Sequence, residues 1–388
     1  MKDKDFLMIP GPTPVPESVL HALAKHPIGH RSKEFSKIFC SANEKLKKIA
    51  KTKNDVFIYT ASGTGAMEAG IANTINPGDK VLSLVIGVFG QRFADIAKLY
   101  GADVTEIKVN PGEAISPDQL KEKLKEYKEG ELKAVTLTHS ETSTGTANPI
   151  DKLISLIKET GALVMMDAVT SLACMPLDCD ELGIDVLVSG SQKGFMIPPG
   201  LSFIYVSEKA YAAKAECKTP TYYFCWNQAK KALANDTTPW TPNVNHIVAL
   251  EVALTSMCEE GIDNVTARHA RLRDTLRAGI KALGLKLLTE DETASAAITA
   301  IYPPEGIAVP DIRAAFKNDW NMIVANGQKD LKDKIFRMGH LGFVTDRDIL
   351  TGLSALEAVM TKLGHKFEAG AALAAYQKAL KEKELCAA

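Results

Sequence analysis

The sequence predicts an α/β protein with a large, mostly parallel-sheet domain and a smaller C-terminal α+β domain. The chain has 388 residues, which is more than one ordinary hydrophobic core organises. Between about residues 55 and 206, short runs of Val, Leu and Ile alternate with amphipathic helical stretches. This alternation is typical of a parallel sheet that is covered by helices on both faces. Beyond residue 262 the order of the expected elements changes, which indicates a second domain.

The expected elements follow from the hydrophobic pattern and from the residues that end each run. Strands of the large domain are expected at 55–60, 80–86, 103–109, 133–138, 162–167, 185–189 and 201–206. Helices are expected between them at 65–75, 91–100, 117–128 and 150–159. The later part of the chain predicts helices at 245–259, 262–283, 310–319 and 346–363, and short strands near 296–302 and 334–338.

The chain is expected to divide into an N-terminal arm and two domains. The proline-rich segment PGPTPVP cannot be helical, so residues 1–20 are expected to form an extended N-terminal arm. The large domain is then expected at 21–255 and the small C-terminal domain at 256–388.

Composition narrows the classes of function. The formal net charge is −1 and charges of both signs are interleaved, which argues against nucleic acid or an anionic membrane as a main partner. The N-terminus lacks the apolar core of a secretion signal, and no run of about 18 apolar residues is present. The seven cysteines are scattered without a C-x-x-C pair, which predicts reduced cytoplasmic thiols and no metal site.

Ligands of an open α/β sheet bind beyond the carboxyl ends of its strands, so the residues that follow each strand are informative. The first expected strand runs into TASGTG (60–65) and then a helix. Backbone N–H groups and hydroxyls at a helix N-terminus predict an anion site, although no Lys follows as in a Walker motif. Taken alone, this segment also fits an ordinary strand–helix connection.

Two charged residues follow later strands. Asp167 ends the apolar run LVMMD, and a buried carboxylate needs a cationic partner such as a protonated pyridine nitrogen. Lys193 lies in SGSQKG (189–194), where burial would favour the neutral amine that attacks an aldehyde. Alternatives for each residue alone are a helix cap or structural ion pair for Asp167 and a solvated loop lysine for Lys193.

A fourth strand end, THSETSTG (138–145), would bring hydroxyl groups and an imidazole to the same edge, or would form a turn with local side-chain bonds. The motifs together indicate more than any one of them does. Pyridoxal 5′-phosphate (PLP) uses an anion cradle, a carboxylate for its ring nitrogen and a lysine for its aldehyde. The sequence therefore predicts a PLP-dependent enzyme.

These segments resemble the class V aminotransferases, a branch of the fold-type-I PLP enzymes. Within that branch the sequence is most similar to alanine–glyoxylate and serine–glyoxylate aminotransferases. It also resembles cyanobacterial proteins labelled as the small subunit of a soluble hydrogenase. The similarity runs from MIPGPTPVPE (8–17) to FRMGHLG (336–342). Its most specific motifs are HSETSTG (139–145) and GSQK (190–193) followed by PPG (198–200).

The resemblance implies roles for the matching residues. Lys193 and Asp167 would be catalytic, Lys193 through a Schiff base with PLP and Asp167 through the pyridinium nitrogen. The other implied cofactor contacts are Thr64, Gly65 and Gln192 at the phosphate, Phe89 and Val169 on the ring faces, Thr142 near the phenolic oxygen, and Thr238 and Thr241 at the phosphate of a neighbouring subunit. Arg337 would bind the substrate carboxylate, with Gly11 and Thr142 beside it.

The implied reaction is a ping-pong transfer of the amino group of alanine or serine to a 2-oxo acid such as glyoxylate or pyruvate. The implied assembly is a homodimer with shared active sites. Two residues depart from the family pattern, because Thr238 stands where many relatives have Tyr and Asn326 where they often have Gly. Because of these departures, the resemblance does not establish which contacts Thr238 and Asn326 make in the site.

Two other functions remain as alternatives. A PLP-dependent lyase of the cysteine-desulfurase type would need a nucleophilic cysteine, and Cys217 and Cys225 lie in a loop-like region without a motif that marks them. An accessory subunit of a soluble hydrogenase would leave the lysine, carboxylate and phosphate motifs without a role. The spacing of the cysteines also shows no pattern for an iron–sulfur cluster.

Overall fold

The computed structural model describes the backbone of residues 4–387 and the side chains up to residue 382. Its centre is a seven-stranded sheet in which five neighbouring strands run parallel. The strand order is β2 (Asp55–Tyr59), β10 (Ser202–Val206), β9 (Val186–Gly190), β8 (Leu163–Asp167), β5 (Leu132–Thr138), β3 (Lys80–Val85) and β4 (Asp103–Lys108). Only β10 is antiparallel to its neighbours, so the prediction of a mostly parallel sheet is confirmed.

Helices cover both faces of this sheet, because its central strands are apolar on both sides. One face packs against α3 (Gly63–Thr74), α4 (Val88–Leu99), α8 (Glu208–Glu216) and α9 (Trp226–Leu233). The other packs against α2 (Lys33–Ala50), α5 (Pro117–Leu124), α6 (Ile150–Lys158) and α10 (Val244–Glu260). Two short helices, α1 (Glu17–Leu23) and α7 (Cys179–Leu182), complete this part of the chain.

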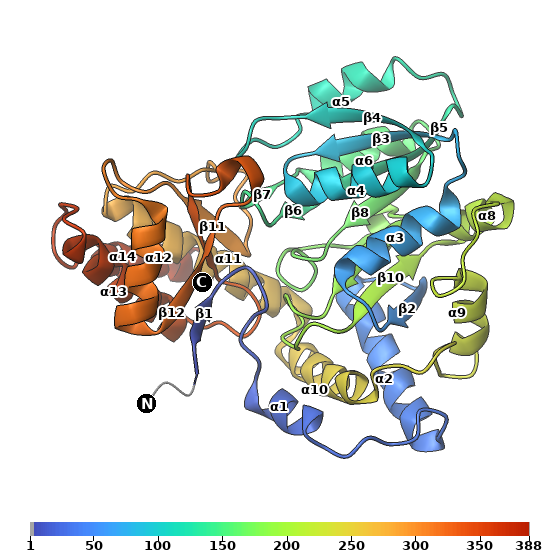
Figure 1. Ribbon diagram of the computed structural model, residues 1–388, viewed down its shortest axis with the longest axis horizontal. Coiled ribbons are helices and arrows are strands. Elements are labelled where there is room, and N and C mark those ends of the chain that lie inside the picture. The colour runs from blue at the N-terminus through green and yellow to red at the C-terminus, as the bar shows by residue number, and fades with distance from the viewer. Residues whose placement is uncertain (1–3, 388) are drawn as a thin grey trace.

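A second, smaller sheet has its own hydrophobic core. Its strand order is β1 (Phe6–Met8), β12 (Met322–Asn326), β13 (Phe336–Gly339) and β11 (Ile298–Ile301). Around it lie α11 (Ile262–Ala282), α12 (Val309–Trp320), η1 (Lys329–Leu331), α13 (Asp346–Lys362) and α14 (Ala371–Ala387). Figure 1 shows these C-terminal helices gathered on one side of the molecule and the seven-stranded sheet on the other.

The N-terminal segment contacts both sheets. Its first part, β1, pairs in parallel with β12, so the start of the chain lies in the C-terminal sheet (Figure 1). The arm then crosses to the large sheet, and α1 begins at Glu17, within the segment that was expected to be extended. The expected boundary between residues 255 and 256 falls inside α10, whose apolar residues up to Met257 pack in the large core.

Most predicted elements are present. Each of the seven predicted strands between residues 55 and 206 agrees with the structure to within one residue at either end. The sequence analysis missed α2, α8, α9 and β12. Among residues 4–387, no helix is both long and apolar enough to cross a bilayer.

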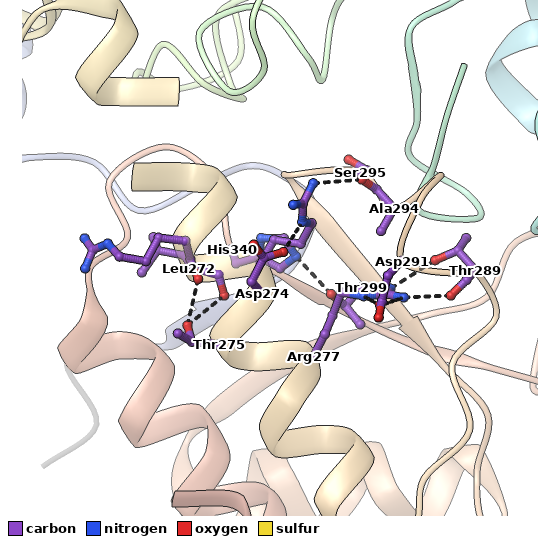
Figure 2. A network of polar contacts seen from close by, with 12 residues as sticks. Leu272, Asp274, Thr275, Arg277, Thr289, Asp291, Ala294, Ser295, Thr299 and His340 are labelled. Carbon is purple, nitrogen blue, oxygen red and sulfur yellow. Dashed lines mark hydrogen bonds and ion pairs between the residues drawn. The ribbon is translucent and has the colours of Figure 1, made fainter. Parts of the chain in front are cut away.

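The buried side chain of Arg277 holds the connection between α11 and β11 in place. Arg277 of α11 donates to Thr289 Oγ1 at 3.1 Å and to the Thr289 carbonyl at 2.7 Å, and its Nε donates to Asp291 Oδ1 at 2.8 Å (Figure 2). A few residues on, the Ser295 N–H donates to the Gly145 carbonyl of the large domain. His340 is buried, and its Nε2 lies 3.0 Å from the Thr299 hydroxyl (Figure 2).

Candidate active site

Lys193 lies immediately beyond the carboxyl end of β9 and is buried, with 8% of its surface exposed. Its Nζ donates to the Pro10 carbonyl at 2.8 Å, so the N-terminal arm passes directly over the lysine. A Cβ at Gly11 would lie 2.8 Å from Lys193 Cδ, and only glycine leaves room for the lysine there. Burial, together with the nearby Arg337 guanidinium, lowers the pKa of Lys193 to about 8.

Asp167 ends β8, the strand next to β9, and is 3% exposed. Among the described residues its carboxylate accepts one hydrogen bond, from the Val169 N–H to Oδ1 at 2.8 Å. Burial raises the pKa of Asp167 to about 7, and the nearby Lys193 acts in the opposite direction. The carboxylate is therefore short of positive charge, and a cation placed against it would lower this pKa.

The N-terminus of α3 is the position at which the sequence predicts an anion cradle. The Ser62 side chain makes no capping bond, and the N–H groups of Gly63 and Thr64 precede the first intrahelical bond. The Gly65 N–H is already used, because it donates to the Ser62 carbonyl at 2.8 Å. Of the residues predicted at the phosphate, Thr64 thus offers a free backbone donor and Gly65 does not.

Three more predicted residues surround this helix end. Val169 lies against Gly63, where a Cβ would come within 2.7 Å of Val169 Cγ2. Gln192 approaches from the Lys193 loop, and its buried Oε1 has no hydrogen-bond partner in the described part of the chain. The Thr64 hydroxyl accepts a bond from Arg92 Nη1 at 2.9 Å, and the Arg92 guanidinium also lies over the Phe89 ring, 4.6 Å from its centroid.

The segment 140–147 forms a short hairpin of β6 (Ser140–Glu141) and β7 (Thr146–Ala147) next to these residues. The Thr142 hydroxyl lies 2.6 Å from that of Thr170. The Thr142 carbonyl accepts a bond from Arg337 Nη1 at 2.7 Å, which ties Arg337 of β13 to the large domain. The hairpin therefore joins the candidate cofactor residues to the candidate substrate residue.

Arg337 is buried and also donates from Nε and Nη2 to the Asn326 carbonyl, at 2.8 and 2.7 Å. These three bonds leave its terminal nitrogens with further N–H groups for a ligand. Burial lowers the pKa of Arg337 to about 10, so the guanidinium stays charged near neutral pH. The Asn326 side chain is turned to Asp333, with bonds of 2.7 and 3.0 Å, and therefore does not replace Arg337 as an anion donor.

Thr238 and Thr241 lie beside the end of β2, where both line a small hollow together with Thr60. Thr238 is buried, and its hydroxyl donates to the Trp240 carbonyl at 2.7 Å. Thr241 is exposed on the same segment, beside the stacked rings of Tyr222 and Trp240. Thr241 is therefore the residue of the two that a second chain could reach.

The residues at this edge fit PLP. Among the described residues, Asp167 is a buried carboxylate without a cation directly bonded to it. Lys193 is a buried amine whose pKa is lowered, and its charge interacts with both Asp167 and Arg337. The edge of the sheet thus offers a carboxylate, an amine and an anion cradle in the set that this cofactor requires.

Comparison with known proteins agrees with this geometry. Residues 6–332 match the family Aminotransferase class-V, and the chain belongs to this family of enzymes. The soluble hydrogenase 42 kDa subunit of Anabaena cylindrica is 48% identical over 97% of this chain and 98% of that protein. Serine–glyoxylate aminotransferase of Methylorubrum extorquens is 34% identical over 99% of this chain and 98% of that protein.

The fold comparison gives the same class. The crystal structure of alanine–glyoxylate aminotransferase from Nostoc sp. matches with a TM-score of 0.88 at 32% identity, covering 92% of this chain and 95% of that one. The fold is that of the fold-type-I PLP aminotransferases, as predicted. The family implies PLP as its cofactor.

Sequence reasoning missed several residues that shape the site. Thr170 holds the Thr142 hydroxyl, and Arg92 holds Thr64. Glu141 is fully buried beside them. The sequence signal for Glu141 was available, because one carboxylate stands among the hydroxyls of THSETSTG, but its partners are more than 50 residues away.

Proposed function

We propose that this aminotransferase transfers the amino group of a small amino acid, such as alanine or serine, to a 2-oxo acid such as glyoxylate or pyruvate, with PLP bound through Lys193. The observation that carries the proposal is the burial of three charged side chains, those of Lys193, Asp167 and Arg337. The names of relatives support the substrates, since both alanine–glyoxylate and serine–glyoxylate aminotransferases are among them.

Bound PLP supplies an aldehyde for covalent attachment and a ring that withdraws electrons from the substrate α-carbon. Lys193 would hold the cofactor through its aldehyde, and Lys193 Nζ would be the base that moves the substrate α-proton. A pKa near 8 suits this exchange, because both protonation states of Lys193 are accessible near neutral pH. Asp167 would hold the ring nitrogen of the cofactor and would favour its protonated form.

Arg337 binds the carboxylate of the amino acid. Its bonds to the Thr142 and Asn326 carbonyls hold the guanidinium plane before a substrate arrives, so little side-chain entropy is lost on binding. Pro10 and Gly11 cover the other side of Lys193 and limit access of water to its amine. The site therefore favours amino acids whose carboxylate and α-carbon are the main recognition elements.

The lyase alternative has less support. Cys217 donates to the carbonyls of Ala72 and Ile75 at the end of α3, and Cys225 is the N-cap residue of α9. Cys174 does lie beside this loop, since a Cβ at Gly194 would be 2.9 Å from its Sγ. Burial raises the pKa of Cys174 to about 12, which disfavours the thiolate that a desulfurase needs.

A homodimer and a cytoplasmic location remain part of the proposal. The exposed ring of Tyr222 stacks on Trp240, 4.9 Å between centroids, next to the exposed Thr241. Aromatic side chains of this kind are enriched in protein interfaces, which supports a partner subunit on this face. Light scattering on the purified protein tests for the dimer. A monomer at micromolar concentration would rule out the proposed contact of Thr241 with the phosphate site of a second chain.

A spectroscopic titration tests the proposed reaction. The wild-type protein should take up one PLP per chain and gain a visible absorption band, lose that band with L-serine or L-alanine, and regain it with glyoxylate. Lys193→Ala should lower the rate of transfer by at least roughly 10²–10⁴-fold, the usual contribution of a general acid–base group. Lys209→Ala, which removes a lysine at the opposite edge of the sheet, is the matched control. A protein that takes up PLP but reacts with neither amino acid would overturn the proposed substrates.

A further inference from the structure

Glu141 is a charged residue at the centre of the site that the proposed reaction leaves without a role. It is 0% exposed, and it lies one residue before Thr142, whose carbonyl holds Arg337. The Glu141 carboxylate also contributes to the electrostatic environment of both Lys193 and Asp167. A buried carboxylate is costly unless its oxygens are satisfied, so its partners show what it does.

All of its partners are hydrogen-bond donors from two segments. Oε2 accepts from the N–H groups of Phe89 and Gly90, at 3.0 and 3.1 Å. Oε1 accepts from the Ser143 N–H at 3.0 Å and from the Ser143 hydroxyl at 2.7 Å. The carboxylate thus holds the start of α4 against the hairpin 140–147.

These bonds replace a missing local cap. The residue before α4 is Gly87, which has no side chain to cap the helix. The Val88 N–H donates to Ser143 Oγ at 3.1 Å, and the next two N–H groups donate to Glu141, so the first turn is satisfied entirely from the hairpin. Gly87 permits this approach, because a Cβ there would lie 2.5 Å from both Glu141 Cγ and Ser143 Oγ.

The capped turn carries Phe89, and the hairpin carries Thr142. We propose that Glu141 is a positioning residue of the active site, whose carboxylate binds the N-terminus of α4 and so fixes the Phe89 ring and the Thr142–Arg337 pair in one arrangement. The proposal rests on the proposed function, in which Phe89 stacks on the cofactor and Arg337 binds the substrate. It assigns to Glu141 no contact with either molecule.

The variant Glu141→Gln tests this role at constant shape. A glutamine carboxamide presents N–H groups to one of the two donor pairs, so either α4 or Ser143 loses its acceptor. We expect the apoprotein to exchange the Phe89 and Gly90 amide hydrogens faster, and PLP to bind roughly 10-fold more weakly, which corresponds to about 1.4 kcal/mol. The circular dichroism of bound PLP should also change, because it reports the orientation of groups around the ring.

Asp185→Asn is the matched control. Asp185 is a buried carboxylate at the opposite edge of the same sheet, where it accepts from the Val164 N–H at 2.9 Å and the Ser207 hydroxyl at 2.8 Å. This variant should lose thermal stability but keep wild-type PLP affinity and the wild-type circular dichroism of the bound cofactor. The control therefore distinguishes a general loss of stability from a change in the positions of Phe89 and the Thr142–Arg337 pair.

Ser143→Ala gives a second, milder test that is usable even where Glu141→Gln does not fold. It removes one donor to Glu141 and the acceptor of Val88, and it should shift PLP affinity and circular dichroism in the same direction by a smaller factor. The proposal would be overturned if every one of these variants that folds binds PLP with wild-type affinity and shows the wild-type circular dichroism of the bound cofactor. A wild-type protein that takes up no PLP would instead overturn the proposed function.

Discussion

Helices α3 and α4 begin at the same edge of the large sheet, yet their N-termini are used differently. Both begin in glycine-containing segments that lack a local side-chain cap. At α4 the first N–H groups are bonded to Glu141 and Ser143 of the hairpin. At α3, within the part of the chain that the structure describes, no side chain caps the first turn.

This difference teaches how a protein chooses which helix end receives a ligand. Every helix N-terminus attracts an anion through its free N–H groups and its dipole. Here one N-terminus is occupied by the protein's own carboxylate, and the other stays available for an external anion. The two ends are linked, because Arg92 of α4 donates to the Thr64 hydroxyl of α3.

In the proposed function, the cofactor phosphate binds at α3 and the substrate carboxylate binds at Arg337, so the two anionic groups occupy separate sites. Arg337→Ala should raise KM for the amino donor by roughly 30-fold or more, since losing one partner of a buried charge pair costs about 2–5 kcal/mol. PLP affinity should remain within a few-fold of wild type. Steady-state kinetics with L-serine, together with a PLP titration, measures both effects, and an unchanged KM would remove Arg337 from the substrate site.

The Gly87→Ala variant breaks the arrangement at α4. The new methyl group would overlap Glu141 and Ser143, which are held by four hydrogen bonds and cannot easily move. We expect the free energy of unfolding to fall by about 1–3 kcal/mol, the usual cost of overpacking. Gly63→Ala at α3 should cost less, because its closest contact is the half-buried side chain of Val169. Urea unfolding of the two apoproteins measures both free energies of unfolding. Equal decreases in the two variants would contradict this account.

The Ser62→Asp variant makes α3 resemble α4. An aspartate at the N-cap should stabilise the apoprotein by about 0.5–1 kcal/mol through capping and the helix dipole. The same carboxylate would repel a phosphate at Gly63 and Thr64, so PLP affinity should fall while stability rises. Ser32→Asp, at the already capped start of α2, should change neither property strongly. Tighter PLP binding by the Ser62 variant would place the phosphate elsewhere.

The pH dependence of cofactor uptake sharpens the role of Lys193. Only the neutral amine attacks an aldehyde, and the pKa of this lysine is lowered to about 8. Between pH 7 and 8 the neutral fraction should rise roughly fivefold, and above pH 9 it should level off, since one pKa unit is a tenfold ratio of the two forms. Stopped-flow absorbance on the apoprotein measures this rate, and a rate that keeps rising toward pH 10.5 would indicate an ordinary exposed lysine.

Much of the fold could be predicted from the sequence because strand signals are local. Continuous apolar runs ended by polar residues located all seven strands of the large sheet, and with them Asp167 and Lys193. The predicted start of α4 at residue 91 was three residues late. Nothing in the local sequence marks Val88 as helical, since its acceptor is the Ser143 hydroxyl, 55 residues away along the chain.

The sequence by itself determined the class of the protein, the parallel sheet, and the carboxylate and lysine at the ends of neighbouring strands. Only the tertiary structure decided which helix N-terminus stays open, because that depends on where Glu141 lies after the hairpin folds back on α4. The tertiary structure likewise placed Pro10 over Lys193 and tied Arg337 to Thr142. These contacts join segments far apart in the chain, and only packing of the two sheets brings them within hydrogen-bond distance.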